Sequence, residues 1–291
     1  MERTDKNIVK KAIPKRPGDA NKGTMGTLLS ICGSYGMVGA AILAGKAALR
    51  CGVGLEKNAL PKSVYPIAAQ SILESVYFPL EETAEGKISF CNADFLLNQA
   101  AKSTAVLIGC GLSVCDDTKK LVQSFIENCE KPMVLDADAL NCISENPEIL
   151  KKRRAETIIT PHPGEMARLC GSTAERVNQS RAETAAGFAE KYGVVTVLKG
   201  SGTIIASPGG RILLNTTGNS GMATGGSGDV LAGMTAALLA QGKSAFECAA
   251  AAVYLHGLAG DLAAEQLGKI SVLPSDIIEY IPKALMSCGL N

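Results

Sequence analysis

A glycine-rich loop that opens directly into an apolar helix constrains this chain more than any other feature. A loop without bulky side chains lets backbone N–H groups and the positive end of a helix converge on an anion, so we predict a phosphate cradle here. Its members are Gly225, Gly226, Ser227 and Gly228, within the run Asn219-Ser220-Gly221-Met222-Ala223-Thr224-Gly225-Gly226-Ser227-Gly228-Asp229 that precedes the apolar residues 230–241.

Asp229 follows the cradle in the first turn of the expected helix. A carboxylate there would repel a bound phosphate unless it had a chemical role, and in phosphoryl transfer that role is to accept the proton of the attacking hydroxyl. We expect the helix N-terminus to lower the pKa of Asp229, which would make it a weak base that acts late in the transfer. The alternative is a flexible loop in which Asp229 only favours the start of the helix.

Short apolar runs alternate with helical patterns from residue 27 to residue 198, which predicts a mainly parallel sheet covered by helices on both faces. Beyond Lys199 two short runs flank a turn at residues 208–210, which predicts an antiparallel edge. The expected strands are residues 27–32, 105–108, 133–135, 157–160, 194–198, 203–206 and 211–214, and the expected helices are residues 37–51, 92–102, 117–129, 173–191, 226–241, 244–266 and 274–286. Residues 1–22 are charged and contain Pro14 and Pro17, so we expect an extended lead-in before a single domain over residues 23–291.

Composition narrows the function classes. A net charge of +1 gives no electrostatic reason to expect nucleic acid or an anionic membrane as a partner. No apolar run is long enough for a membrane span, and the N-terminus lacks the apolar core of a secretory signal. The ten cysteines form no Cys-x-x-Cys pair, as in a reducing compartment, and two histidines cannot make a histidine-rich metal site. We therefore expect a cytoplasmic protein that acts on small molecules.

Glycine and polar residues gather where the expected strands end, which is where ligands bind in open α/β sheets. Each of these polar residues also has an explanation that needs no ligand. Asp136 and Asp138 could cap a helix or form a turn, and Glu165 could favour a helix start. His162 and Lys199 could be solvated. Because so many of these residues fall directly after strands, we predict that they line one ligand-binding crevice. No complete G-x-G-x-x-G fingerprint or P-loop occurs.

The glycine-rich loop and the polar residues at the strand ends, taken in their order along the chain, resemble those of the ADP- or ATP-dependent NAD(P)H-hydrate dehydratases. These enzymes are a branch of the ribokinase-like superfamily. The similarity runs from about residue 20 to residue 285, and the pair Pro161-His162-Pro163-Gly164-Glu165 and Gly225-Gly226-Ser227-Gly228-Asp229 is its most specific part. The resemblance implies a ribokinase-like three-layer α/β/α fold. It also implies repair of hydrated NADH and NADPH (NADHX and NADPHX), in which ADP or ATP with Mg²⁺ phosphorylates the ring hydroxyl and phosphate is then lost.

The resemblance also implies roles for individual residues. The positions that match substrate contacts are Ala40, Gly111, His162 and Asp229, and those that match nucleotide contacts are Lys199, Gly200, Ser201, Gly202, Thr203 and Gly228. The resemblance assigns no protein ligand to Mg²⁺, since this ion often keeps its water ligands. Relatives suggest a homo-oligomer, a tetramer. The residues before Gly23 leave no room for the epimerase domain of two-domain relatives, so a separate NAD(P)HX epimerase is the expected partner.

The chain departs from the family at two places. Residues 55–58 are more polar than the family normally is there, which argues against a strand, and Cys110 stands where proline is common. Two other functions stay open: a ribokinase-like kinase of a small alcohol, such as a vitamin precursor, and a non-catalytic nucleotide sensor. A kinase would release a stable phosphate ester, whereas a dehydratase would release free phosphate and NAD(P)H.

Overall fold

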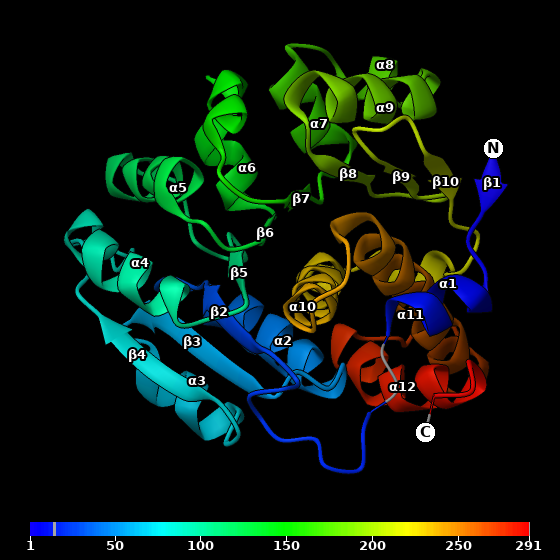
Figure 1. Cartoon of the computed structure of the whole chain (residues 1–291), viewed down its shortest axis with the longest axis horizontal. Coiled ribbons are helices and arrows are strands. Elements are labelled where there is room, and N and C mark those ends of the chain that lie inside the picture. The colour runs from blue at the N-terminus through cyan, green and yellow to red at the C-terminus, as the bar shows by residue number, and fades with distance from the viewer. Residues whose placement is uncertain (14–15, 291) are drawn as a thin grey trace.

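The computed structural model describes residues 1–13 and 16–290 and contains a ten-stranded sheet of order β1-β10-β9-β8-β7-β6-β5-β2-β3-β4 (Figure 1). Neighbouring strands are parallel except for the pairs β8–β9 and β9–β10, so the predicted mainly parallel sheet with antiparallel strands is confirmed. The strands are β1 (Glu2–Arg3), β2 (Thr27–Ile31), β3 (Leu55–Pro61), β4 (Val76–Leu80), β5 (Ala105–Ile108), β6 (Met133–Leu135), β7 (Thr157–Ile159), β8 (Val195–Leu198), β9 (Ile204–Ala206) and β10 (Ile212–Leu214).

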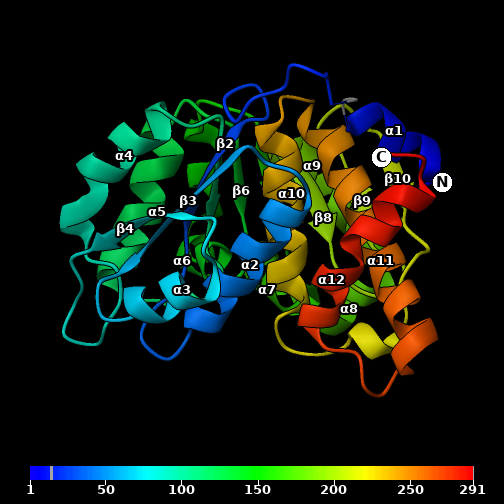
Figure 2. The same cartoon turned by 90° about the horizontal axis from the view of Figure 1, so that it is seen from below.

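Helices cover both faces of the sheet, as Figures 1 and 2 show from two directions. One buried apolar cluster joins the sheet to α2, α10, α11 and α12, and a second joins the opposite face to α4, α5, α6, α7 and α9. The chain therefore has the expected three-layer α/β/α architecture. The helices are α1 (Lys6–Ala12), α2 (Val38–Arg50), α3 (Tyr65–Ser71), α4 (Ala93–Ala101), α5 (Asp116–Asn128), α6 (Asp138–Ile143), α7 (Pro163–Cys170), α8 (Ala174–Gln179), α9 (Arg181–Tyr192), α10 (Ser227–Ala240), α11 (Ala245–Leu267) and α12 (Pro274–Ser287).

Helix α10, which follows the glycine-rich loop, is a core element. It is apolar around its whole circumference, and every residue from 230 to 240 is buried, as expected for a helix enclosed on all sides. A side chain at Gly233 would collide with the backbone of Ala44 in α2, so the two helices approach closely. This packing fixes the loop at the N-terminal end of α10. Within residues 1–13 and 16–290, no helix combines the length and apolarity needed to cross a bilayer.

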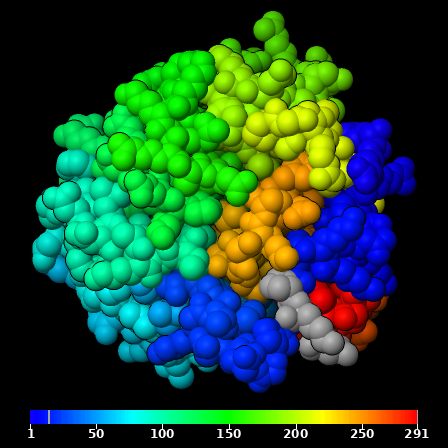
Figure 3. Space-filling model, viewed as in Figure 1, coloured from blue at the N-terminus to red at the C-terminus, as the bar shows by residue number. Residues whose placement is uncertain are grey.

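The N-terminal segment is packed, so the expectation of an extended lead-in is wrong for residues 2–12. Strand β1 pairs with Leu213 and Leu214 of β10, and α1 lies against α11 (Figure 1). Although three of the seven residues of α1 are lysines, Val9 and Ala12 lie three residues apart on one face and are both buried. On the face shown in Figure 3 the blue N-terminal residues adjoin the yellow and red parts of the chain. Pro14 of the expected lead-in, and Asn291, lie outside the described residues.

The argument against a strand at residues 55–58 is also wrong, because β3 is a full strand between β2 and β4. Glu56, Lys57 and Asn58 are all buried in it. Lys57 reaches the end of α4, where its Nζ donates to the carbonyl of Lys102 over 3.3 Å. Tertiary pairing on both sides therefore outweighs the unfavourable local composition. The helical pattern expected at residues 173–191 forms two helices, α8 and α9.

Candidate active site

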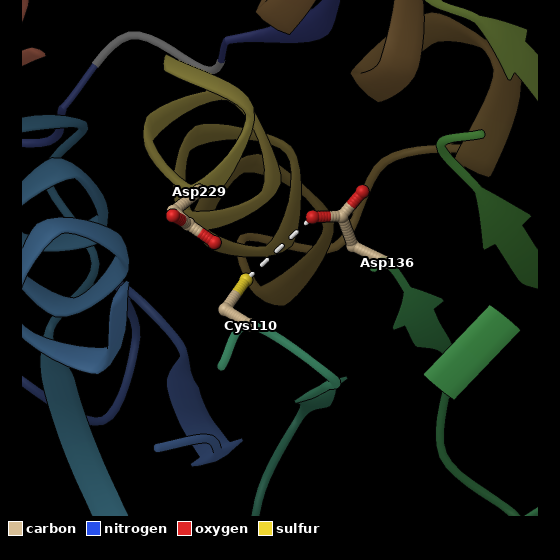
Figure 4. A group of neighbouring side chains, drawn as sticks. All are labelled: Cys110, Asp136 and Asp229. Carbon is tan, nitrogen blue, oxygen red and sulfur yellow. Dashed lines mark hydrogen bonds between the residues drawn. The ribbon is translucent and has the colours of Figure 1, made fainter. Parts of the chain in front are cut away.

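The predicted polar residues lie at the carboxyl ends of four neighbouring parallel strands. Cys110 follows β5, Asp136 follows β6, His162 follows β7, and Lys199 follows β8. Because these strands are adjacent in the sheet, their ends meet along one edge. The N-terminal turn of α10 brings Asp229 to the same edge, where it lies beside Cys110 and Asp136 (Figure 4).

A cavity of about 870 Å³ opens at this edge. Its wall includes every residue predicted to contact nucleotide, the whole cradle and His162, so these positions from separate parts of the chain share one space. Ala40, Gly111 and Asp229 are not among its lining residues. The lining consists of His162, Lys199, Gly200, Ser201, Gly202, Thr203, Asn215, Thr216, Thr217, Gly218, Asn219, Ser220, Met222, Ala223, Thr224, Gly225, Gly226, Ser227, Gly228, Leu231, Val253, His256 and Gly257.

The cradle has the backbone that its glycines were expected to allow. Gly226 has φ 99° and precedes the first residue of α10, and a side chain there would lie 2.6 Å from Leu43 and 3.1 Å from Pro274. Position 225 faces open space. The first N–H groups of a helix have no partner within the helix. In α10 the N–H of Ser227 donates to the Thr224 carbonyl over 3.3 Å, so among the described residues those of Gly228 and Asp229 are left to bind an anion.

Lys199 lies beneath the cradle in a buried charged group. Its Nζ is 2.7 Å from Asp136 Oδ1 and 3.8 Å from Glu165 Oε2, and Thr160 Oγ1 donates to the same Asp136 oxygen over 2.6 Å. Burial would lower the pKa of Lys199, but the two carboxylates outweigh it and raise this pKa, so the ammonium stays charged. A Cβ at Gly228 would lie 3.4 Å from Nζ, which places the ammonium directly against the phosphate cradle.

The expected lowering of the Asp229 pKa is wrong. Burial of the carboxyl, together with the nearby Asp136 carboxylate, raises the pKa of Asp229 to about 6, against weaker opposing effects of Cys110 and Lys199. The side chains of Asp229, Cys110 and Asp136 present oxygen and sulfur atoms within 4.8 Å of one another (Figure 4). Asp229 is therefore a stronger base than an ordinary aspartate, although it stands at a helix N-terminus.

His162 and Glu165 cap helix α7 reciprocally. The N–H of Gly164 donates to His162 Nδ1 over 3.0 Å, and the N–H of His162 donates to Glu165 Oε2 over 2.7 Å. Burial, with Lys199 and Arg168 nearby, lowers the pKa of His162, so the half-exposed imidazole is neutral at pH 7. Glu165 therefore does favour the helix start, and it also connects His162 to Lys199. Side-chain contacts run from Asp136 through Lys199 and Glu165 to His162, and a carboxylate oxygen of Asp229 lies within 4.8 Å of Asp136.

Ala40 and Gly111 lie beside each other. Gly111 has φ 63°, and a side chain there would lie 2.9 Å from Ala40 Cβ and 2.6 Å from the Met37 carbonyl oxygen. Asp138 supports the adjoining turn, because the N–H of Ser113 donates to Asp138 Oδ2 over 2.8 Å. Asp138 thus has the turn-forming role that was one of its two alternatives, whereas Asp136 belongs to the charged group.

Several cavity residues escaped the sequence analysis. His256 of α11 is partly buried at the cavity wall, its Nε2 lies 3.4 Å from Ser227 Oγ, and burial lowers its pKa to about 4, so it is neutral. A histidine in an otherwise alanine-rich helix was the available signal for it. Residues 215–219, which follow β10, form a further part of the wall, and their run of asparagine and threonine after a strand was the signal there.

One group of side chains could contribute to a cation site among residues 1–13 and 16–290: Cys110, Asp136 and Asp229. The two carboxylates suit Mg²⁺, which prefers oxygen ligands, and the thiol does not. Asp136 Oδ1 is already held by Lys199 and Thr160, which leaves its Oδ2 on the side of Asp229. The residues present therefore fit a Mg²⁺ ion shared with phosphate oxygens and water.

Comparisons with known proteins agree with this geometry. A family model described as NAD(P)H-hydrate dehydratase matches residues 28–283. The bifunctional NAD(P)H-hydrate repair enzyme of Moorella thermoacetica is 41% identical over 273 residues, which are 94% of this chain and 52% of that protein, so the chain spans about half the length of this relative. The ADP-dependent (S)-NAD(P)H-hydrate dehydratase of Neisseria meningitidis is 39% identical over 256 residues, 87% of this chain and 82% of that protein. The ADP/ATP-dependent NAD(P)H-hydrate dehydratase of Bacillus subtilis, co-crystallised with ATP and Mg²⁺, superposes with a TM-score of 0.84 at 31% identity over 99% of this chain and 98% of that one.

Proposed function

The chain belongs to the NAD(P)H-hydrate dehydratase family, and from that premise we propose that it uses ADP or ATP to dehydrate hydrated NADH and NADPH. The observation that supports the proposal most is the single cavity lined by the phosphate cradle, by His162 and by residues 199–203, with Asp229 at the same edge of the sheet. Ala40 and Gly111, which adjoin each other, would complete the substrate side.

The proposed reaction solves a leaving-group problem. Hydroxide leaves the nicotinamide ring poorly, but a phosphate ester leaves readily. The ring hydroxyl oxygen attacks the terminal phosphorus of the nucleotide, its proton passes to the Asp229 carboxylate, and the bond between that phosphorus and the nucleotide breaks. The C–O bond to the phosphate then breaks, phosphate leaves with the electron pair, and a proton is lost from the neighbouring ring carbon, whose C–H electrons restore the ring double bond. With a pKa of about 6, Asp229 is ionised at neutral pH and still basic enough to hold this proton.

The cradle and Lys199 would stabilise the charge that moves during the transfer. The N–H groups of Gly228 and Asp229 at the start of α10, and the Lys199 ammonium against Gly228, would be fixed before the reaction begins. Mg²⁺ would supply further neutralisation of the phosphates, with the Asp136 and Asp229 carboxylates as its nearest oxygen donors from the chain. Asp136 would hold Lys199 in place through the 2.7 Å contact.

The wider context of the reaction is part of the same proposal. We expect a cytoplasmic homo-oligomer, a tetramer, that works with an NAD(P)HX epimerase. A kinase that releases a stable ester, or a non-catalytic sensor, would use the same cavity. The family membership favours the dehydratase over both.

The proposal is tested by incubating the protein with hydrated NADH and either ADP or ATP in the presence of Mg²⁺. We expect recovery of the absorption band of reduced nicotinamide with one or both nucleotides and none without nucleotide. Nucleotide binding without any recovery of NADH would contradict the proposal and favour the sensor. Hydrated NADPH in a parallel reaction would give the substrate preference.

A further inference from the structure

Beyond the cradle, the cavity has a second wall formed by residues 215–219, which all line it. We call this segment the outer wall. If phosphates occupy the cradle, the nucleoside part of the nucleotide must fill the remaining space between residues 200–203 and the outer wall. Leu231 and Val253 provide apolar surface there, and the outer wall provides polar groups. The position of this segment should therefore affect how tightly nucleotide binds.

Helix α11 holds the outer wall from one side. The N–H of Gly218 donates to Asp261 Oδ2 over 2.9 Å, and Asn219 Nδ2 donates to Asp261 Oδ1 over 2.9 Å, so one carboxylate fixes two consecutive residues. Thr217 Oγ1 lies 2.9 Å from the carbonyl oxygen of Tyr254. A side chain at Gly257 would collide with Thr217, so the segment lies directly on the helix backbone.

Thr4, directly after the N-terminal strand β1, holds the outer wall from the other side. Thr4 Oγ1 donates to Asn215 Oδ1 over 2.7 Å, and the Thr4 N–H donates to the carbonyl of Leu214 over 3.0 Å. Asn215 Nδ2 in turn donates to the Thr217 carbonyl over 3.0 Å. Thr4 and Asn215 are 6% and 4% exposed, so water competes little for these bonds. Thr4 lies outside the residues that the family model matches.

We propose that Thr4 and Asp261 are positioning residues that clamp the outer wall from two sides, so that nucleotide affinity depends on the N-terminal strand. The inference rests on the proposed function, because it takes a nucleoside di- or triphosphate as the ligand. Neither side chain lines the cavity, so both act through residues 215–219. Phosphoryl transfer itself depends on the cradle and Asp229, and these do not contact Thr4. Loss of the clamp should therefore change the Kd and KM for the nucleotide and leave kcat nearly unchanged.

The test measures binding of ADP by calorimetry, and kcat and KM for ADP with hydrated NADH, in the full chain and its variants. Thr4→Val keeps the shape of the side chain and removes the hydroxyl, and we expect it to raise the Kd and KM for ADP about 3- to 10-fold, the worth of one buried hydrogen bond. The kcat should stay within about twofold of the wild-type value, because the lost interaction stabilises the bound nucleotide equally in the ground state and in the transition state. Asp261→Asn weakens a charge-assisted pair and should raise Kd by about tenfold or more.

Two matched variants separate positioning from folding. Thr4→Ser keeps the hydroxyl and should restore most of the ADP affinity. Arg3→Gln changes the exposed residue that precedes Thr4, at the end of β1, and should bind ADP as the wild type does. Thermal unfolding of all variants identifies any that fold poorly.

Three results would overturn the inference. The first is wild-type ADP affinity in Thr4→Val and Asp261→Asn. The second is a fall in kcat at unchanged KM. The third is equal loss in Thr4→Ser and Thr4→Val. If the wild type bound neither ADP nor ATP, the proposed function would fail together with the inference, whereas failure of the variants alone leaves the proposed function standing.

Discussion

Two buried polar clusters lie in the same sheet and differ in how their groups are satisfied. The first is the site cluster of Asp136, Thr160, Glu165 and Lys199, in which each carboxylate meets an ammonium, a hydroxyl or an N–H group. The second is the β3 cluster of Ser30, Glu56, Asn58 and Ser75. Within the described part of the chain, Ser30 Oγ, Glu56 Oε1 and both polar atoms of the Asn58 side chain have no hydrogen-bond partner.

The difference shows how a buried carboxyl can be kept in either charge state. In the site cluster the Lys199 ammonium compensates Asp136, so charge is retained where phosphate would bind. Glu56 is fully buried with only a hydroxyl partner, Ser75, and burial raises its pKa to about 7. The site cluster therefore keeps its groups charged, whereas burial of Glu56 in the β3 cluster favours a neutral carboxyl.

Asp229→Asn should have the largest effect. It removes the proton acceptor at the edge of the site cluster while leaving the cradle and the cavity lining in place, so turnover should fall about 10²- to 10⁴-fold. The affinity for ADP in the absence of Mg²⁺ should change by about twofold or less, because Asp229 does not line the cavity. Steady-state kinetics and calorimetry measure the two quantities. Turnover like that of the wild type would remove Asp229 from the mechanism.

Lys199→Met should be the most destabilising change in the site cluster. It leaves Asp136 buried without an opposite charge, which costs about 3–5 kcal/mol of unfolding free energy. Lys57→Met is the matched variant in β3, because Lys57 is also buried but contacts only a carbonyl and a hydroxyl. Lys57→Met should lower the unfolding free energy clearly less than Lys199→Met does. Chemical denaturation of both variants makes the comparison, and equal losses would show that the Lys199 pair is not special.

Glu56→Gln should change the pH dependence of stability. The folded pKa of Glu56 is raised from 4.5 to about 7, so the folded state holds this proton more tightly than the unfolded state does. Its contribution is therefore present below pH 4.5 and is lost as the pH rises to about 7, by at most on the order of 3 kcal/mol. The variant should match the wild type near pH 4 and be the more stable protein at pH 8. A difference that does not grow with pH would show that Glu56 is ionised throughout.

The smallest predicted effect is an acid limb in the activity profile. Because the pKa of Asp229 is raised to about 6, its carboxylate should protonate below that pH, and kcat/KM should then fall by about tenfold per pH unit. Activity should be flat just above this range. An acid limb near the ordinary aspartate pKa would mean that Asp136 and burial do not act on Asp229 as the structure indicates.

The sequence predicts those features that depend on local pattern. The cradle, the start of α10 and strands β5 and β6 were all placed within one residue by apolar runs and glycines. Features that depend on distant partners were missed. The polar composition of β3 hid a strand that two neighbours pair with, and the few apolar residues of α1 hid its packing on α11.

The same limit applies to the candidate site. The pKa shift of Asp229 was predicted with the wrong sign, because the helix start is visible in the sequence but the neighbouring Asp136 carboxylate is not. Asp136 was left between two alternatives for the same reason, since its contact with Lys199 joins residues 63 positions apart. Asn215 and His256 enter the cavity from other elements, and no spacing in the sequence connects them to the cradle.

The central claim is that a phosphoryl group held by the cradle is transferred to the hydrated ring next to Asp229 and then released. The most direct test is the stoichiometry of one reaction with hydrated NADH and the nucleotide that supports turnover. The account predicts one nucleotide cleaved, one free phosphate and one NADH recovered per turnover. Accumulation of a stable phosphorylated product, with nucleotide cleaved but no NADH recovered, would contradict it.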